Sequence, residues 1–263
     1  QRTITVNDLP TVTWSALANV CANDAAITLT GGLPAGGTYS GPGVSSGQFN
    51  PQAVGAGTYT LVYTYADANG CSDSATETIT VEPLPAVSLS PFAAVCVDNG
   101  VLTLTGGSPA GGTYTGTGVT GGQFDPQAVG PGTYDIVYTV TGTTCNASDT
   151  QQIVVNPLPI VTLPAFADAC IDAGTITLTG GTPVGGTYSG TGVTGGVFDP
   201  QVAGLGNTLI TYTFTDANGC TNSDTASINV NSGPTVTLSA FADLCVNDAP
   251  LTLSGGMPMG GTY

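Results

Sequence analysis

The segment VCANDAAITLTGGLPAGGTYSGPG (20–43) indicates the architecture of the chain, because closely similar segments begin again at Val95, Ala169 and Leu244. The seven cysteines keep the same rhythm, with successive spacings of 50, 25, 49, 25, 50 and 25 residues. Self-similarity at a fixed period is the signature of a tandem array in which each period forms one structural unit. The chain is therefore predicted to be a string of similar domains.

The period also predicts the domain boundaries. It divides the chain into three whole repeats, at 7–82, 83–156 and 157–231. Residues 1–6 match the last strand of a repeat, and residues 232–263 match the N-terminal part of a further one. We therefore expect the array to continue past both ends of this sequence. The proline-containing segments between repeats are expected to be extended, semi-stiff joints, as in beads on a string.

Local patterns within each repeat indicate β-structure. Apolar and polar residues alternate in ITLT (27–30), and TYTLVYTYAD (58–67) and ATETITV (75–81) are rich in β-branched and aromatic residues. Asn-Gly within DANGC (67–71) is a strong hairpin signal between the two long runs. Six or seven short strands per repeat predict an all-β chain of small antiparallel, immunoglobulin-like β-sandwiches. Tyr59 and its counterpart Tyr134 resemble the tyrosine corner of such domains.

The glycine-rich phrase GGLPAGGTYSGPG (31–43) resembles a phosphate-binding loop, but the residues around it do not fit one. A Walker loop needs a lysine and a following helix, whereas this phrase continues as TYS, a predicted strand. We interpret it as a turn in which Pro34 sets φ, Gly36 and Gly37 allow positive φ, and later glycines relieve a bend.

The charge balance excludes several classes of function. The chain holds 17 acidic residues against one basic residue, Arg2, and it has neither lysine nor histidine. A net charge of −16 excludes nucleic acid as a partner and opposes docking on an anionic membrane. No run of apolar residues is long enough for membrane insertion. Nucleophile–histidine pairs are impossible and paired catalytic carboxylates are not evident, so we expect no enzyme and no cofactor.

The cysteine spacing predicts one disulfide within each repeat, and no zinc site because close ligand pairs and histidines are lacking. Each bond would join the start of the early strand to the tip of the last hairpin. An oxidising, extracellular compartment follows. The predicted pairs are Cys21–Cys71, Cys96–Cys145 and Cys170–Cys220, with Cys245 pairing beyond the sequence.

Structural calcium is a further hypothesis, and it depends on this pairing. A Cys21–Cys71 bond would bring Asp24 to the hairpin tip that carries Asp67 and Asp73, which would make an oxygen-rich cluster. The third repeat offers Asp172, Asp216 and Asp224 in the places we take as matching, whereas the second lacks an acidic residue in its hairpin. Asx residues capping their own turns are the alternative interpretation.

The pattern VCxxDxxxTLTGGxPxGGTYxGxGVxxGxFxP, followed by DANGC, resembles the immunoglobulin-like (PKD-like) repeats of giant Bacteroidota surface proteins, including gliding-motility adhesins. The resemblance covers nearly the whole chain and implies a cell-surface stalk or filament exported by type IX secretion. It also implies O-glycans at DSA (73–75) and DTA (224–226), which makes Ser74 and Thr225 candidates; DTQ (149–151) departs from that motif. Asn146 lies in an N-glycosylation sequon by letter.

The leading hypothesis is therefore a non-enzymatic structural region of an extracellular fibre or adhesin. Its expected partners are neighbouring repeats of the same chain and identical chains in a fibre. Two alternatives remain at this point: a module array that binds glycan, ice or protein directly, and an accessory region of a large secreted hydrolase. An aromatic or flat threonine face in every repeat would favour direct binding, but Trp14 has no counterpart in the other copies.

Overall fold

The computed structural model describes residues 2–263, which divide into two compact units on either side of the Val155–Asn156 peptide bond. Repeats 1 and 2 belong to the first unit. Repeat 3 and the fourth segment (232–263) belong to the second. Strands and one-turn helices are the regular elements of both units, and the whole repeats share one order of elements, except that repeat 2 has one extra pair of two-residue strands. The prediction of an all-β tandem array of small immunoglobulin-like sandwiches is confirmed.

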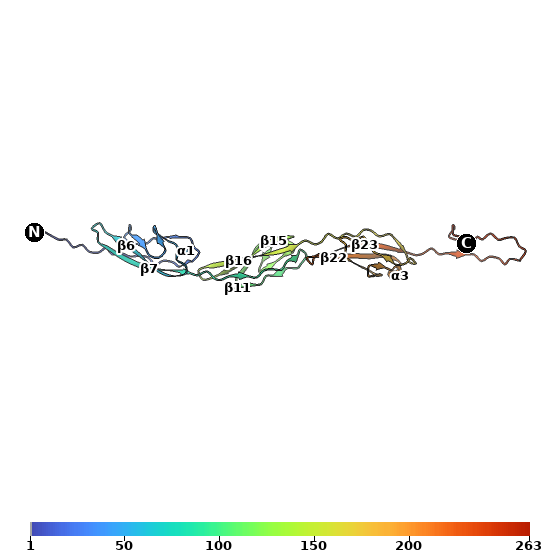
Figure 1. Cartoon of the computed structure of the whole chain (residues 1–263), viewed down its shortest axis with the longest axis horizontal. Coiled ribbons are helices and arrows are strands. Elements are labelled where there is room, and N and C mark those ends of the chain that lie inside the picture. The colour runs from blue at the N-terminus through green and yellow to red at the C-terminus, as the bar shows by residue number, and fades with distance from the viewer. Residues whose placement is uncertain (1) are drawn as a thin grey trace. The chain divides into compact units, whose positions relative to one another are not determined.

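Repeat 1 is built from two sheets. One has the strand order β1-β7-β6-β3 and the other has the order β2-β5-β4. The long strands β6 and β7 form an antiparallel hairpin (Figure 1), which is the framework of the repeat. The elements are β1 (Val20–Cys21), β2 (Ile27–Thr28), β3 (Thr38–Ser40), β4 (Val44–Ser45), β5 (Gln48–Phe49), α1 (Pro51–Val54), β6 (Gly57–Ala66) and β7 (Ser72–Glu82).

Repeats 2 and 3 follow the same plan, with long hairpins β15–β16 and β22–β23. Repeat 2 contains β8 (Ser88–Leu89), β9 (Val95–Cys96), β10 (Leu102–Thr103), β11 (Gly107–Ser108), β12 (Thr113–Thr115), β13 (Val119–Thr120), β14 (Gln123–Phe124), α2 (Pro126–Val129), β15 (Gly132–Thr141) and β16 (Asn146–Asn156). Repeat 3 contains β17 (Ala169–Cys170), β18 (Ile176–Thr177), β19 (Thr187–Ser189), β20 (Val193–Thr194), β21 (Val197–Phe198), α3 (Pro200–Ala203), β22 (Gly206–Thr215) and β23 (Thr221–Asn231). The fourth segment contains β24 (Thr237–Leu238) and β25 (Gly256–Met257).

The core of each repeat lies between its four-stranded sheet and its three-stranded sheet. In repeat 1 the inner face of the hairpin contributes Leu61, Tyr63 and Ile79, and the second sheet contributes Phe49; all four side chains are almost completely buried. Burying an apolar side chain of this size contributes roughly 1.5–3 kcal/mol. The period-2 alternation along β6 and β7 thus places one face of the hairpin in the core.

One strand pair of repeat 1 is parallel, whereas its other strand pairs are antiparallel. β1 pairs with β7 in parallel, with Val20 opposite Val81 and Cys21 opposite Glu82. The pairing continues in the backbone bond from Ala22 N to the Glu82 carbonyl oxygen, at 3.0 Å. This pairing places Cys21 at the C-terminal end of β7, where the chain leaves the repeat. We call the end formed by β1 and residues 81–82 the exit end, and residues 67–71 the hairpin tip.

The glycine phrase forms a cradle around a buried tyrosine. The Tyr63 hydroxyl donates to the Pro34 carbonyl oxygen at 2.6 Å and accepts from Gly37 N at 2.8 Å. A Cβ on Gly32 would lie 2.6 Å from the Tyr63 ring, and one on Gly37 would lie 2.4 Å from the Thr64 carbonyl oxygen. Gly36 adopts positive φ as expected, but Gly37 does not. Its role is different from the predicted one: it leaves room for the ring.

The same cradle recurs in repeats 2 and 3, around Tyr138 and Tyr212. A second tyrosine packs on the first in each repeat, with ring centroids 4.7 Å apart in the pairs Tyr39–Tyr63, Tyr114–Tyr138 and Tyr188–Tyr212. The peptide bond before the proline of the phrase is cis in all four copies. The phrase is therefore structural, and its repetition follows from the repetition of the core.

The one-turn helices were not foreseen, although their signal is in the sequence. Asn50, Asp125 and Asp199 cap them, and a proline follows each cap at the first helical position. The predicted tyrosine corner is present in repeats 1 and 2, at Tyr59 and Tyr134, whereas repeat 3 has Thr208 at that position. The Tyr59 hydroxyl donates to the Val54 carbonyl oxygen at 2.7 Å, immediately upstream of the strand.

Candidate functional site

The disulfide found in the first unit joins two repeats rather than two parts of one repeat. Cys21 of repeat 1 is bonded to Cys145 of repeat 2, with a sequence separation of 124 residues and Cα atoms 5.6 Å apart. Cys71 has a free thiol. The predicted pairs Cys21–Cys71 and Cys96–Cys145 are therefore wrong.

The parallel pairing of β1 explains the correction. Cys21 lies at the exit end beside Glu82, whereas Cys71 lies at the hairpin tip, just before β7 begins at Ser72. At ~3.3 Å per residue the length of β7 separates these two ends by roughly 33 Å. No bond can span that distance within a repeat.

The junction between repeats 1 and 2 is formed by the exit end of the first and the hairpin tip of the second. The Cys145 sulfur lies 3.8 Å from the Glu82 carbonyl oxygen, and the Cys21 sulfur lies 3.5 Å from the Thr144 carbonyl oxygen. Glu82 also accepts a hydrogen bond from the Asn19 side chain at 3.2 Å. Residues 82–85 and 142–145 line a small cavity of about 200 Å³ beside the bond.

The two bonded cysteines are shielded from solvent. Cys21 is 8% exposed and Cys145 is 3% exposed, although both lie at ends of their repeats. Reduction of a disulfide requires a thiolate to reach one of its sulfurs. The junction therefore protects the bond that holds it together.

Of the remaining cysteines, some are disulfide-bonded and others carry free thiols. Cys96 and Cys220 are disulfide-bonded. Cys170 is free, which contradicts its predicted pairing with Cys220. It lies at the exit end of repeat 3, where β17 pairs in parallel with β23 and Cys170 lies opposite Asn231. Cys245 of the fourth segment is also free and exposed in this structure.

An aspartate organises the hairpin tips of repeats 1 and 3. The Asp67 carboxylate accepts from the backbone N–H groups of Asn69 and Cys71, both at 2.9 Å. Asp216 accepts from Asn218 and Cys220 in the same way. In repeat 2 a shorter tip is closed by a backbone bond from Gly142 N to the Cys145 carbonyl oxygen, at 2.9 Å. The tips thus present their cysteines on defined backbone turns.

These bonds make the stability of repeat 1 depend on pH. Partial desolvation acts to raise the pKa of Asp67, but the hydrogen bonds from Cys71 and Asn69 outweigh it and hold that pKa below its usual value. A depressed folded-state pKa contributes stability that is present above the unfolded pKa of about 3.9 and is lost as the pH falls towards the folded value.

We therefore expect Asp67→Asn to lower the stability of repeat 1 at neutral pH and to flatten its acid-induced loss below about pH 4. The fluorescence of Trp14, the single tryptophan, follows unfolding of repeat 1 in denaturant at each pH. Asp8→Asn at an exposed position is the matched control. If the stability of repeat 1 falls as steeply with decreasing pH in Asp67→Asn as in the parent, this account is wrong.

The acidic residues considered for calcium are not brought together within a repeat. Asp24 lies at the exit end, where its carboxylate accepts from Cys21 N at 2.8 Å, whereas Asp67 and Asp73 belong to the other end of the hairpin. Asp172 is exposed near the exit end of repeat 3, and Asp216 is at its tip. The premise of the calcium hypothesis, a Cys21–Cys71 bond, does not hold. Among residues 2–263 no group of three or more candidate ligands could hold a metal ion.

Strand register corrects the matching of Asp73 with Asp224. Asp224 lies opposite Tyr212 and Asp149 lies opposite Tyr138, so their counterpart in repeat 1 is Ala75, opposite Tyr63. The two aspartates serve the fold: Asp149 accepts from Leu89 N and Asp224 accepts from Leu163 N, both at 2.8 Å. Each ties the first segment of its repeat to the long hairpin, a role that the sequence reasoning missed.

The glycosylation candidates Ser74, Thr225 and Asn146 are all exposed on long strands. Ser74 lies opposite Thr64, whereas Thr225 lies opposite Thr211, so these two do not occupy equivalent positions. Their modification stays a prediction.

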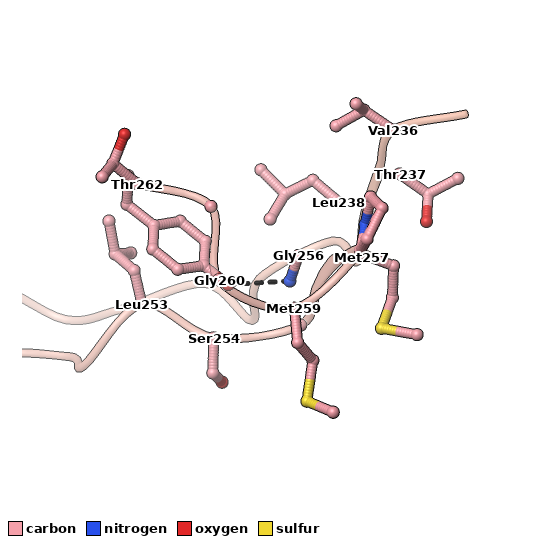
Figure 2. A pocket seen from close by; sticks show the side chains of 14 residues that line it. Val236, Thr237, Leu238, Leu253, Ser254, Gly256, Met257, Met259, Gly260 and Thr262 are labelled. Atoms are coloured by element: carbon pink, nitrogen blue, oxygen red, sulfur yellow. Dashed lines mark hydrogen bonds between the residues drawn. The ribbon is translucent and has the colours of Figure 1, made fainter. Parts of the chain in front are cut away.

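A larger cavity lies in the fourth segment (Figure 2), with a volume of about 510 Å³. Leu238, Leu253 and Met257 line it, and the Gly256 N–H donates to the Tyr263 hydroxyl at 2.7 Å. In the whole repeats the counterparts of Gly256 contact the tyrosine ring of the long hairpin. The cavity therefore lies on the face that the long hairpin covers in the whole repeats. It belongs to the fold rather than to a binding site.

Within residues 2–263 none of the helices has the length and apolar character needed to cross a membrane.

No family model and no curated protein matches the chain. Solved structures that are similar include a Ca²⁺-stabilised adhesin with which an Antarctic bacterium binds ice, at 19% identity and a TM-score of 0.33 over 88% of this chain and 76% of that one. Titin domains I67–I69 match at 13% identity and a TM-score of 0.30, over 82% of this chain and 95% of theirs. A Bacteroides ovatus glucan-utilisation protein, SGBP-B, matches at 18% identity and a TM-score of 0.23, over 92% and 76%. At these scores, the immunoglobulin-like assignment rests on the strand order and the tyrosine corner described above.

Proposed function

We propose that this chain is a load-bearing stalk or filament segment of an extracellular surface protein, of the fibre or adhesin type. The observation that carries the proposal is the Cys21–Cys145 disulfide, which fastens one repeat to the next across their linker. A domain that acted alone would gain nothing from a bond to its neighbour, whereas an array under tension transmits load through it. Disulfides persist in oxidising compartments, which supports an extracellular location.

The chemistry of the chain agrees with a mechanical role. It has no histidine or lysine to act as a base near neutral pH. The cavity beside the disulfide is only about 200 Å³ and is lined partly by backbone at a linker. The dense hydroxyl content and the net charge of −16 favour solubility in water over adhesion to nucleic acid or membrane.

The proposal is tested by removing repeat 2 (83–156) from the full protein in its native cell. Glu82 would then directly precede Pro157, so the shortened chain keeps the acidic or polar residue and the proline of the normal linker. For a stalk, we expect antibody labels on either side of the deletion to move closer together while attachment of the cell to its target surface persists. Loss of attachment with an unchanged amount of surface protein would instead assign binding to the repeat itself. Absence of the protein from the cell surface in the parent strain would overturn the proposal.

A further inference from the structure

We propose that the outer face of the four-stranded sheet in each repeat is a surface through which one copy of this chain associates laterally with a second copy. In repeat 1 this face consists of the side chains of β3, β6 and β7 that point away from the core, and we call it the hydroxyl face. Lateral association rests on the proposed stalk or filament function for its purpose, since it supplies the contact by which such chains would bundle.

Strand register aligns the residues of the hydroxyl face in rows that cross the sheet. In repeat 1, Thr38 of β3 lies opposite Thr64 of β6, and Thr64 lies opposite Ser74 of β7. The rows that follow towards the exit end are Ser40–Val62–Thr76, Thr60–Thr78 and Thr58–Thr80. Successive rows are about 6.6 Å apart along the strands, and neighbouring strands are about 4.8 Å apart. The face is thus an almost continuous array of hydroxyl and methyl groups around Val62.

The rows nearest the hairpin tip recur within repeat 2 and within repeat 3. They are Thr113–Thr139–Ser148 and Thr115–Val137–Thr150 in repeat 2, and Thr187–Thr213–Ser223 and Ser189–Thr211–Thr225 in repeat 3. Each position carries serine or threonine, except that valine replaces it at the centre of one row in repeats 1 and 2. The hydroxyl face is therefore a feature of the repeat and not of one copy.

The charge distribution favours an identical chain as the partner of this face. Among the described residues, the hydroxyl faces of repeats 1 and 3 hold no charged side chain, although the net charge of the chain is −16. That of repeat 2 holds Asp135, whose carboxylate accepts from the Gln152 side chain at 2.9 Å. The acidic residues of repeat 1 lie in its first segment, at its ends or on the opposite side of β7: Asp8, Asp24, Asp67, Asp73, Glu77 and Glu82. Copies that meet through hydroxyl faces therefore avoid placing carboxylates against each other, which costs free energy.

The hydroxyl groups of the face are available to a partner. In the described part of the chain, the side-chain hydroxyls of Thr38, Thr64 and Ser74 bond to no protein group. A hydroxyl both donates and accepts hydrogen bonds, so the face is complementary to a second copy of itself. Threonine is β-branched and has few rotamers, so ordering these side chains on contact costs little conformational entropy.

The size of the face predicts how strong the association is. Over the 10 residues of β6 and across three strands, spacings of ~3.3 Å and ~4.8 Å give an area of at most roughly 500 Å². A standard protein–protein interface buries about 800 Å² on each partner. One pair of repeats is therefore too small for a permanent complex, and we expect reversible association that depends on protein concentration.

Opposite charges placed on the hydroxyl face provide the test. The acidic face variant carries Thr64→Glu, Thr139→Glu and Thr213→Glu, and the basic face variant carries lysine at the same positions. Each variant alone should self-associate about tenfold more weakly than the parent, because like charges that lie opposite each other are destabilising. An equimolar mixture of the two should associate at least as tightly as the parent. Sedimentation velocity over a concentration series measures this, with the free thiols alkylated to prevent mixed disulfides.

Thr28→Glu, Thr103→Glu and Thr177→Glu together are the matched control, since they add the same charge at exposed positions of the three-stranded sheets. This control should self-associate nearly as the parent does and should not gain affinity for the basic face variant. Salt should strengthen association of the parent, because it screens repulsion between acidic ends and leaves an uncharged contact intact.

A parent chain that stays monomeric at every concentration would overturn the proposal. So would a control variant that is impaired as much as the acidic face variant, or a mixture of face variants that associates no better than either alone. Restoration by mixing cannot arise from unfolded chains, and the Trp14 fluorescence transition checks the fold of repeat 1 in each variant. None of these outcomes bears on whether a single array is a stalk, which the deletion of repeat 2 tests.

Discussion

Single chains stretched from their ends are expected to gain about 40 nm of contour length when the Cys21–Cys145 disulfide is reduced. The bond closes a loop of 124 residues, and an extended chain spans at most ~3.3–3.6 Å per residue. In the oxidised chain the load passes from Cys21 directly to Cys145, so unfolding of the enclosed parts of repeats 1 and 2 adds no length.

The experiment is done with Cys96→Ser, so that Cys21–Cys145 is the bond under study, and with free thiols alkylated. The double variant Cys21→Ser/Cys96→Ser is the control and should give the long contour with or without reductant. A gain of only about 17 nm would match a loop of roughly 50 residues. It would show that Cys21 pairs within its own repeat, contrary to the structure.

The largest loss of folding stability is expected for truncation of the cradled tyrosine. Tyr63→Ala removes a side chain that is 1% exposed, and loss of a buried aromatic side chain costs about 3–5 kcal/mol. Tyr63→Phe keeps the ring but leaves the Gly37 N–H and the Pro34 carbonyl oxygen without the hydroxyl. An unsatisfied buried polar group costs about 1–3 kcal/mol, so we expect a smaller but clear loss.

Trp14 reports this loss selectively. It belongs to the core of repeat 1, its ring centroid lies 6.4 Å from that of Tyr63, and no other tryptophan is present. The midpoint of its fluorescence transition in denaturant should fall in the order parent, Tyr63→Phe, Tyr63→Ala. Tyr138→Phe removes the equivalent hydroxyl from repeat 2 and should leave the Trp14 transition nearly unchanged. Equal midpoints for Tyr63→Phe and the parent would show that the cradle is not a stabilising contact.

Several features of the fold are local enough to be predicted from the sequence. The period of the cysteines indicates the tandem array, and the alternation in residues 58–67 and 75–81 indicates the two long strands. Asn-Gly at 69–70 indicates the turn between those strands, and a bend or turn is found there. The tyrosine corner is predictable because Tyr59 bonds to a carbonyl only five residues away.

Other features depend on partners that are distant in sequence. The cradle of Tyr63 reaches across 29 residues to Pro34, and the aspartate that ties down Leu89 is 60 residues away. The glycines of the phrase therefore looked like turn residues, whereas Gly32 and Gly37 are needed because the ring leaves no room for a Cβ. The one-turn helices have a local signal in NPQAV and DPQAV, where an Asn or Asp cap is followed directly by proline.

The amino-acid sequence alone is enough to predict an oxidised, all-β array with one structural unit per period, because periodicity and alternation are properties of order along the chain. It did not determine which cysteines meet. That was decided by β1, which pairs in parallel with β7 and so places Cys21 at the end of its repeat opposite to Cys71. Strand direction is set by packing in three dimensions, and two residues of strand carry no sequence signal for it. The tertiary structure therefore replaces the predicted bond within repeat 1 by a bond from repeat 1 to repeat 2.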